Sequence, residues 1–326
     1  MRDRPEDFDE GLLRPALRQW GIEASTLDYA PVGFGDFHWV AGDRAGRRWF
    51  VTVADVRRQT FDGLRLAMET AAVLREEAGL GFVVAPTRAA DGATLRRLDR
   101  HRYAMSVFPY VGGTAGHFGD ELPETERGLV IDLLAELHAT PPPSTTPARP
   151  VDLAGRAWLE RTLGDDGSLP WLGGPYSGPA RELVATHART LRRRLEEFDR
   201  LAGRPGEPVV THGEPHPGNL LRADGDRRLL VDWDTAGMAV PERDLWLVAR
   251  SDDDLARYAD ATGHSPDRDA LALYRLRWAL NDVAEFVAWF RSPHARTADA
   301  EQAWDGLTAT LDGLAVGGSP LPGCGQ

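Results

Sequence analysis

Apolar residues recur along the chain at two different spacings, and the spacing changes near residue 110. Before that point, short apolar runs such as Arg48–Ala54 and Tyr103–Pro109 alternate with turn residues, which predicts strands. Helical spacing of apolar residues predicts a helix at 8–20 and an amphipathic helix at 61–78. The first part of the chain therefore predicts a small sheet that carries a helix.

A glycine-bearing hairpin is expected within this sheet. The run 32–40 contains Gly33 and Gly35, and Asp43–Gly46 is a turn signal before the strand at Arg48–Ala54. The two glycines are also consistent with simply shaping that hairpin. Two further strands are expected, at Phe82–Pro86 and Thr94–Leu98.

After residue 110 the pattern becomes helical. Helices are predicted at 124–139 and 179–202, and the segment 241–316 is almost wholly helical. Between them, the apolar runs Val209–Val210 and Leu229–Val231 are expected to pair as a β-hairpin. The chain thus predicts an α+β, bilobal architecture, with a β-rich part at 1–111 and a larger, mainly helical part at 112–326.

Composition narrows the class of protein. The 326-residue chain carries a net charge of −12, which argues against a nucleic-acid binder and is common among soluble proteins. The single cysteine, Cys324, excludes an intrachain disulfide. The charged start has no apolar signal region, and no apolar run reaches the ~20 residues that span a bilayer. We expect a cytoplasmic protein that does not bind membranes, and the oligomeric state is left open.

One loop carries the chemistry. Glu214 is followed by Asn219 five positions on and by Asp232 after a short apolar run. In kinase-type phosphoryl transfer, a carboxylate receives the substrate hydroxyl, and an Asn and an Asp hold Mg²⁺ against the nucleotide phosphates. Mg²⁺ uses one or two carboxylates together with phosphate oxygens and waters, which suits Asn219 and Asp232.

These motifs resemble the aminoglycoside phosphotransferase family. The resemblance rests on three motifs and covers nearly the whole chain, with the glycine hairpin, the Leu-rich helix ending at His138 and the helical tail in the expected order. The three motifs are His212 to Asn219, Val231 to Asp234, and Pro241 to Leu245. The family has a protein-kinase-like bilobal fold and phosphorylates hydroxyl groups of small molecules with ATP and Mg²⁺.

The resemblance implies roles for individual residues. Glu214 stands where the catalytic carboxylate stands, which is ordinarily Asp. Asn219 and Asp232 stand at the metal ligands. The expected supporting residues are His212 as a buried loop anchor, Asp234 beside the metal ligand, and Asp244 as an acid that braces the catalytic loop.

The resemblance also implies a nucleotide pocket for ATP or GTP in the part at 1–111. The family's phosphate-gripping Lys corresponds here to Thr52, and all 38 basic residues of the chain are Arg. Arg48, Arg57 or Arg58 could supply the missing charge. The expected cofactor contacts are Gly33 and Gly35 over the phosphates, Thr52 on the third strand, and Phe108 and Tyr110 beside the base.

The acceptor is less defined. Asp282 and Glu285 flank a Trp-rich helix face and could receive a cationic small molecule, although a solvated helix edge fits equally well. Two alternatives stay open. The altered Lys and Asp positions favour a catalytically weak or inactive nucleotide- or metabolite-binding protein. His212, Glu214 and His216 could ligate a hydrolytic metal, but the flanking prolines prevent a helical ligand face.

Overall fold

The computed structural model describes residues 1–316, except positions 6, 58, 99–101, 165–169 and 204–205. Arg58 and Cys324 therefore lie outside the described residues. The chain divides into two compact units, each built from segments that alternate along the sequence. The division of the chain into two parts at residue 111 stays a prediction. The first unit comprises Met1–Gly116, Leu122–Arg149 and Pro208–Val240, and the second comprises His117–Glu121, Pro150–Glu207 and Pro241–Gln326.

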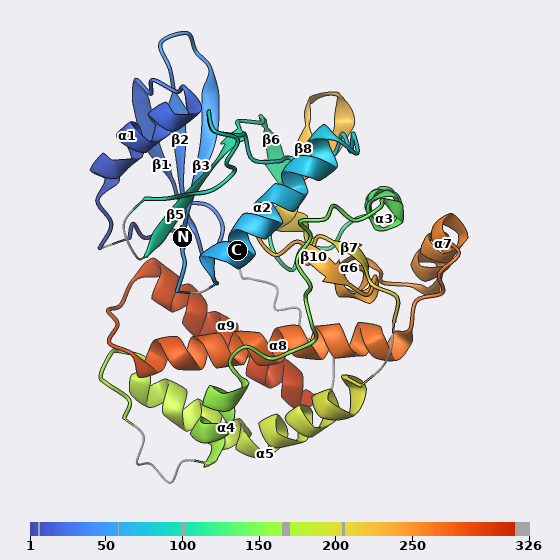
Figure 1. The fold of residues 1–326 in the computed structure, drawn as a ribbon. Helices are drawn as coiled ribbons and strands as arrows, with labels where there is room; N and C mark the ends of the chain where they lie inside the picture. Colours follow the sequence, from blue (N-terminus) through green and yellow to red (C-terminus); the bar gives the residue numbers. More distant parts are fainter. Residues whose placement is uncertain (6, 58, 99–101, 165–169, 204–205, 317–326) are drawn as a thin grey trace. The chain divides into compact units, whose positions relative to one another are not determined.

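A five-stranded antiparallel sheet with the order β1-β2-β3-β5-β4 dominates the beginning of the first unit (Figure 1). The hairpin expected around the turn at 43–46 is confirmed, since Gly42 lies opposite Arg48. The strands are β1 Thr26–Ala30, β2 Phe37–Gly42, β3 Arg48–Asp55, β4 Arg96–Arg97 and β5 Tyr103–Pro109. The glycines expected in the first strand lie in the turn before β2 instead. Gly33 and Gly35 have φ values of 70° and 119°, which favour glycine and interrupt a strand.

The alternation of residues along β2, β3 and β5 gives this sheet two different faces. On one face, Trp39, Val51 and Met105 are fully buried and pack with Leu13 and Leu17. Leu13 and Leu17 belong to a short helical segment, which begins as a 3-10 turn at Glu10–Leu12, continues as α1 Leu13–Leu17 and ends as a 3-10 turn at Arg18–Trp20. The other face, which we call the second face, carries the alternate residues of the same strands, and these residues do not belong to this core.

Two helices complete the first unit. The helix α2 spans Phe61–Glu76 and begins at Thr60, whose hydroxyl accepts a hydrogen bond from the Gly63 amide at 3.1 Å. Its buried residues include Leu64, Met68 and Leu74, at the spacing that the sequence predicts. The helix α3 spans Glu124–Ala139, so the prediction at 124–139 is confirmed.

Three small ladders of the first unit differ from the expected strands. The run at 209 does not pair with the run at 229, so the predicted hairpin is wrong. Instead β7 pairs with β10, and β9 pairs with β8, which in turn pairs with β6. These strands are β6 Gly113–Ala115, β7 Val209–Thr211, β8 Leu220–Ala223, β9 Arg227–Leu230 and β10 Gly237–Ala239, with 3-10 turns at Pro217–Asn219 and Asp224–Asp226.

Two other strand predictions fail or shrink. Phe82–Pro86 forms no strand and contributes one parallel bridge, from Val83 to Leu230. The strand expected at Thr94–Leu98 is reduced to β4. Phe82–Pro86 is a buried apolar run, and burial alone does not separate a strand from an ordered loop.

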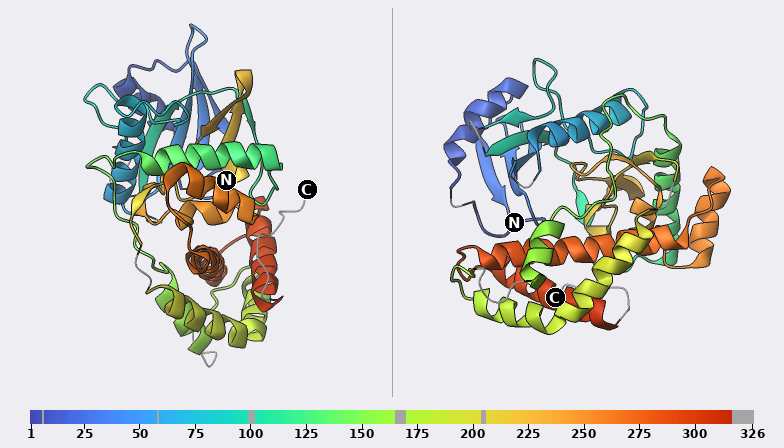
Figure 2. Two further views of the ribbon diagram at one scale, coloured as in Figure 1. Left: turned by 90° about the vertical axis from the view of Figure 1, so that its right-hand side faces the viewer. Right: turned by 60° about the horizontal axis from the view of Figure 1, so that its bottom comes forward.

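The second unit is helical in its described part. Its core lies between α5, α8 and α9, which pack side by side (Figure 2). The run Ser251–Asp254 starts a helix, as the sequence predicts, through a capping box between its two end residues. The helices are α4 Arg156–Gly164, α5 Ser177–Leu201, α6 Glu242–Val248, α7 Asp252–Thr262, α8 Arg268–Arg291 and α9 Ala298–Val316.

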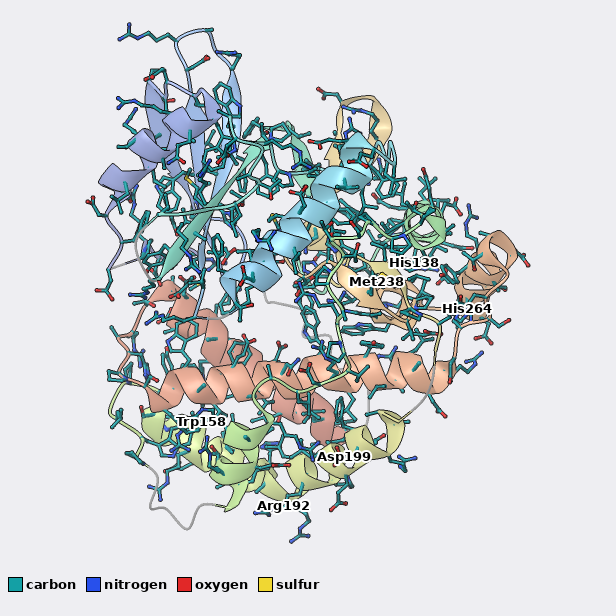
Figure 3. All side chains as sticks on the ribbon, in the orientation of Figure 1. His138, Trp158, Arg192, Asp199, Met238 and His264 are labelled. Atoms are coloured by element: carbon teal, nitrogen blue, oxygen red, sulfur yellow. The ribbon has the colours of Figure 1, made fainter. Side chains whose placement is uncertain are left out.

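Arginines tie the outer helices of this unit together. Arg156 of α4 pairs with Asp199 of α5 at 2.8 Å. The guanidinium of the buried Arg291 lies 5.3 Å from the ring centroid of Trp158, a distance at which a cation is attracted to an aromatic face. Trp158 and Asp199 are labelled in Figure 3. Within the described residues, no helix has both the length and the apolar character that crossing a membrane requires.

Candidate active site

Two strand pairs, one nested inside the other, hold the predicted catalytic segment. The outer pair places Thr211 opposite Gly237, and the inner pair places Leu220 opposite Leu230. The loop 212–219 and the loop 231–236 are therefore closed at both ends and lie against each other. The amide of Val231 donates to the oxygen of Asn219 at 3.0 Å, which joins the two loops directly. Nested pairing, not a single hairpin, brings the motif residues together.

His212 is buried and fixes the backbone of both loops. Its Nε2 lies 2.9 Å from the main-chain oxygen of Val231, and its Nδ1 accepts a hydrogen bond from the amide of Glu214 at 3.2 Å. The ring packs edge-on against Trp233, with centroids 4.6 Å apart. Because both ring nitrogens are engaged with the backbone, His212 has the contacts of an anchor and neither those of a metal ligand nor those of a proton carrier.

The side chain of Asn219 is oriented by two contacts. Its amide nitrogen donates to the main-chain oxygen of Glu214 at 3.0 Å and lies 3.3 Å from Nε2 of His216. With the nitrogen engaged there, the side-chain oxygen is the atom that remains for a cation. His216 is neutral, because burial and then the neighbouring His212 lower its pKa to about 3.

Asp232 has an unusual backbone. Its φ is 65°, and it is the one non-glycine residue with positive φ among the described residues. Such a conformation costs of order 1–2 kcal/mol in residues with a side chain and concentrates at functional sites. The strand β9 ends at Leu230, two residues before this left-handed position.

Carboxylates gather around Asp232. Its pKa is raised because the protein around it desolvates the charged form and because Asp234, Glu214 and Asp36 repel that form. The side chain of Asp232 is exposed to a cavity, and exposure to solvent reduces the cost of desolvating its charge. The raised pKa of Asp232 is therefore attributed mainly to repulsion between the carboxylates. A divalent cation would relieve this repulsion.

Asp234 is held more firmly than Asp232. Its carboxylate accepts a hydrogen bond from Gln59 at 3.1 Å, and its main-chain oxygen accepts one from Arg149 at 3.1 Å. Burial nevertheless raises its pKa, against the attraction of Arg149. No three His, Cys, Asp or Glu side chains of the described chain converge as a complete metal-ligand set. Asn219 and the aspartates offer hard oxygens of the kind that Mg²⁺ takes together with phosphate and water.

One cavity of the first unit, of about 370 Å³, contains most of the predicted nucleotide and metal residues. Its lining combines the second face of the sheet, which carries Phe50, Thr52 and Phe108, with residues of the loops 212–219 and 231–236. Of the predicted residues, Gly33, Thr52, Phe108, Tyr110, Asn219, Asp232 and Asp234 line it. Gly35 lies in the loop beside Gly33, and Glu214 belongs to the loop 212–219 but is outside this lining.

Arginines do not replace the missing Lys inside this cavity, since the described residues that line it include no arginine. The guanidinium of Arg48 lies 3.6 Å over the ring of Tyr110. Arg57 pairs with Asp55 at 2.6 Å. Glu69 on α2, the expected partner of a Lys, pairs with Arg88 at 2.8 Å. The candidate arginines that are described are therefore already engaged elsewhere.

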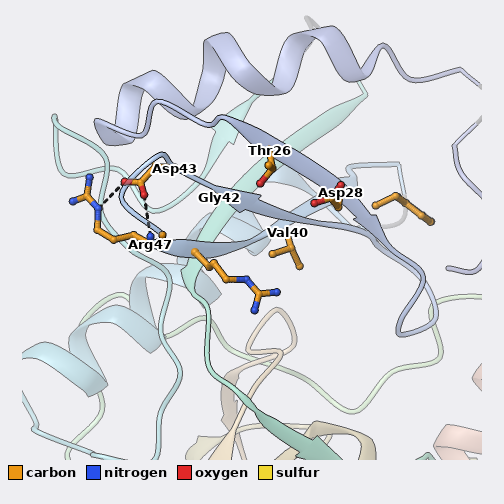
Figure 4. Close-up of a pocket in the computed structure, with 9 residues that line it drawn as sticks. Thr26, Asp28, Val40, Gly42, Asp43 and Arg47 are labelled. Atoms are coloured by element: carbon orange, nitrogen blue, oxygen red, sulfur yellow. Dashed lines mark hydrogen bonds and ion pairs between the residues drawn. The ribbon is translucent and has the colours of Figure 1, made fainter.

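A second cavity lies on the same sheet near the turn between β2 and β3 (Figure 4). It measures about 320 Å³ and includes Thr26, Asp28 and Arg48 in its lining. Asp43 shapes the turn by pairing with Arg47 at 2.7 Å and accepting two backbone amides. These contacts account for the turn, and of the predicted site residues Arg48 alone, a candidate for the missing charge, is in the lining of this cavity.

The remaining predicted residues lie in the second unit. Asp244 is fully buried on α6, and its role toward the catalytic loop stays a prediction. Asp282 is half-buried and Glu285 is exposed, one turn apart on α8. One helical turn before Asp282, Trp278 stacks on Phe118 with centroids 5.2 Å apart. Aromatic and acidic groups thus occur together on this helix.

Residues 36–275 match the model of the APH family, described as the phosphotransferase enzyme family. The chain belongs to this family. As a family member it is a phosphotransferase. The protein is also 30% identical over 308 residues to Protein StrN of Streptomyces griseus, a match that covers 89% of this chain and 87% of the relative.

Solved structures of phosphotransferases share the fold. A spectinomycin phosphotransferase, solved with ADP and spectinomycin, matches with a TM-score of 0.70 at 14% identity and covers 95% of this chain and 98% of that chain. An amicoumacin kinase, solved with AMP-PNP, Ca²⁺ and Ami, matches with a TM-score of 0.58 at 13% identity over 97% and 96% of the two chains. The expected α+β, protein-kinase-like fold is confirmed.

The lining of the 370 Å³ cavity also includes residues that were not predicted from the sequence, among them the ionisable Asp36 and His38. A signal for His38 existed, because the turn at 43–46 fixes the hairpin register and places His38 opposite Thr52. Asp36 lies before β2, in the turn that carries Gly33 and Gly35, which we call the glycine turn. The pairing register of the strands does not extend to this turn.

Proposed function

We propose that this phosphotransferase transfers the γ-phosphoryl group of ATP, in the presence of Mg²⁺, to a hydroxyl group of an aminoglycoside-like or other amino-bearing small molecule. The observation that carries the proposal is the shared cavity. It is lined by Asn219, Asp232 and Asp234 together with the Phe108–Tyr110 segment. Side-chain oxygens that can bind a metal ion therefore lie in the same cavity as an apolar surface for a nucleotide. GTP is the alternative donor.

The residues fit a divalent cation. We infer that the side-chain oxygen of Asn219 and the carboxylate of Asp232 hold it, with Asp234 beside them. When bound, the cation supplies positive charge to the phosphate oxygens. Hydrogen bonding of the Asn219 amide nitrogen to Glu214 supports this role, because it fixes which atom of the amide is presented.

Glu214 is the proposed catalytic carboxylate. Its amide donates to His212 and its main-chain oxygen accepts from Asn219, so its backbone is fixed on both sides. In the transfer, the acceptor oxygen forms a bond to the γ-phosphorus as the bond to the bridging oxygen breaks and ADP leaves. The hydroxyl proton passes to the Glu214 carboxylate. Because the transition state of phosphoryl transfer is loose, the carboxylate mainly has to orient the acceptor hydroxyl, and a glutamate can do so.

We further propose that Asp282 and Glu285 attract a cationic group of the acceptor. The neighbouring stack of Trp278 and Phe118 supports a site for an organic molecule, because aromatic faces bind apolar ring surfaces and cations. Asp282→Asn should then raise KM for a cationic acceptor and leave KM for ATP unchanged. The use of ATP is consistent with a cytoplasmic location, which stays a prediction.

The test begins with calorimetric titration of ATP in the presence of Mg²⁺. Phosphate transfer is then measured over spectinomycin, aminoglycosides, macrolides, aminopropanol and ethanolamine. Glu214→Gln should abolish transfer and keep the affinity for ATP, whereas the exposed control Glu77→Gln should change neither. No binding at millimolar ATP would contradict the proposal. ATP binding without transfer to any compound would favour the weak or inactive alternative.

A further inference from the structure

The face of the sheet that lines the 370 Å³ cavity, which we call its floor, changes from apolar to polar along the strands. This second face of the sheet presents Phe50 opposite Phe108, and two residues farther along β3 it presents Thr52 opposite Ser106. On the next strand, His38 lies opposite Thr52. All five residues line the cavity. An apolar pair near Tyr110 is thus followed by a polar row of three, His38, Thr52 and Ser106, which we call the polar row.

The imidazole of His38 is held in a defined orientation. Its Nδ1 lies 3.1 Å from the hydroxyl of Thr52, and the ring stacks on Phe50 with centroids 5.0 Å apart. Its Nε2 points toward the glycine turn, since a Cβ built on Gly33 would lie 3.3 Å from it. Among the described residues no hydrogen bond engages Nε2. Nε2, which is a donor when the Thr52 hydroxyl donates to Nδ1, therefore faces the space between the sheet and the glycine turn.

The charge of the cavity makes this donor significant. Asp36, Asp232 and Asp234 line the cavity, and no arginine does so among its described residues. His38 itself is nearly fully buried. A polyphosphate entering this space would meet carboxylates and one imidazole, so hydrogen bonds from uncharged groups are the contacts that the sheet can offer.

We propose that His38, positioned by Thr52, binds a nucleotide phosphate through Nε2–H and takes over the place of the missing Lys. The inference rests on the proposed function, because it presumes a nucleotide in this cavity. When the Thr52 hydroxyl donates to Nδ1, Nε2 carries the proton and can donate to a phosphate oxygen. Ser106 completes the row on the side of β5.

The positions of the apolar pair and the polar row along the strands favour a phosphate, and not the base, as the ligand of His38. A base fits on the apolar pair Phe50 and Phe108, beside the Phe108–Tyr110 segment. Two residues along a strand span about 7 Å, which moves from the base toward the ribose and phosphates. The glycine turn then covers the same end of the cavity as the polar row.

The experiment compares the affinities of ATP, ADP and adenosine by calorimetry with Mg²⁺ present. His38→Ala should weaken ATP and ADP by about tenfold and leave adenosine within about twofold, since only the phosphates lose a hydrogen bond to a charged group. His38→Gln keeps an N–H donor at similar reach and should recover most of the loss. Thr52→Val, which removes the hydroxyl at nearly constant shape, should also weaken ATP selectively.

The outcomes separate three cases. If the unmodified protein does not bind ATP, the proposed function fails before this inference is tested. If it binds ATP and His38→Ala leaves the ratio of ATP to adenosine affinity unchanged, the role of His38 is wrong and the proposed function stands. Equal weakening of all three ligands would mean a structural role and would also overturn the inference. His187→Gln on α5, outside the cavity, is the matched control and should alter no affinity.

Discussion

The side-chain amide of Asn219 donates a hydrogen bond to the main-chain oxygen of Glu214 over 3.0 Å. This bond joins the proposed metal ligand to the backbone of the residue that carries the proposed catalytic carboxylate. A change at Asn219 should therefore disturb both halves of the reaction, whereas a side-chain change at Glu214 leaves the bond in place.

We expect Asn219→Asp to lower both stability and kcat. The substitution keeps an oxygen for the cation but places a carboxylate oxygen against the Glu214 carbonyl, where a donor stood. Losing that bond and leaving an acceptor unpaired should cost about 1–3 kcal/mol of unfolding free energy. Urea unfolding and steady-state kinetics measure the two effects. An unchanged unfolding midpoint would show that the bond does not order the loop.

Glu214→Asp distinguishes an adapted site from a decayed one. The backbone at Glu214 is fixed on both sides, so the shorter side chain cannot move forward to compensate. A retreat of ~1 Å should lower kcat about a hundredfold, with KM for ATP unchanged. A higher kcat in the variant would instead mean that the glutamate is a handicap, as the inactive alternative requires.

Asp232→Asn should stabilise the protein in the absence of cation and nucleotide while abolishing transfer. The substitution removes the repulsion from Asp234, Glu214 and Asp36. Asn tolerates the left-handed backbone that Asp232 adopts. Asp232→Ala removes the same charge but tolerates that backbone less well, so it should be less stable than the Asn variant. Thermal unfolding in EDTA compares the three proteins. Equal melting temperatures for all three would contradict both the repulsion and the strain.

The sequence predicts local structure better than pairing. The helix at 124–139 and the hairpin around Asp43–Gly46 follow from periodicity and turn residues close along the chain. The pairing of Thr211 with Gly237 joins residues far apart, through strands of three residues each. Such short strands carry too few side chains to specify a register. The loops of the site were therefore predictable, and the ladders that hold them were not.

The same contrast applies to the residues of the site. Asn219 and Asp232 stand in a motif whose spacing is itself the signal. His38 belongs to no motif, and its proposed role follows only from a cavity whose described lining places it beside Thr52 and includes no arginine. Asp36 could not be predicted, because the turn that carries it follows neither a helical nor a strand period.

The burial of His38 makes a prediction about pH. Burial, and then the nearby amino group of Met1, lower the pKa of His38 to about 3, whereas an unfolded histidine titrates near 6.5. Below pH 6.5 the unfolded chain binds a proton that the folded protein does not. His38 therefore contributes stability that is present above pH 6.5 and is lost as the pH falls toward 3.

His38→Gln removes this proton uptake. Between pH 5.5 and 4.5, the free energy of unfolding of the unmodified protein should fall by about 1.4 kcal/mol more than that of the variant, the amount that one proton contributes per pH unit. Urea unfolding at several pH values measures both slopes, and the carboxylates that titrate in this range are common to both proteins. NMR of labelled histidines is the direct control, since the His38 signal should not titrate above pH 5. Parallel stability curves, or a His38 signal that titrates near pH 6.5, would show that the imidazole is open to solvent and not held under the glycine turn.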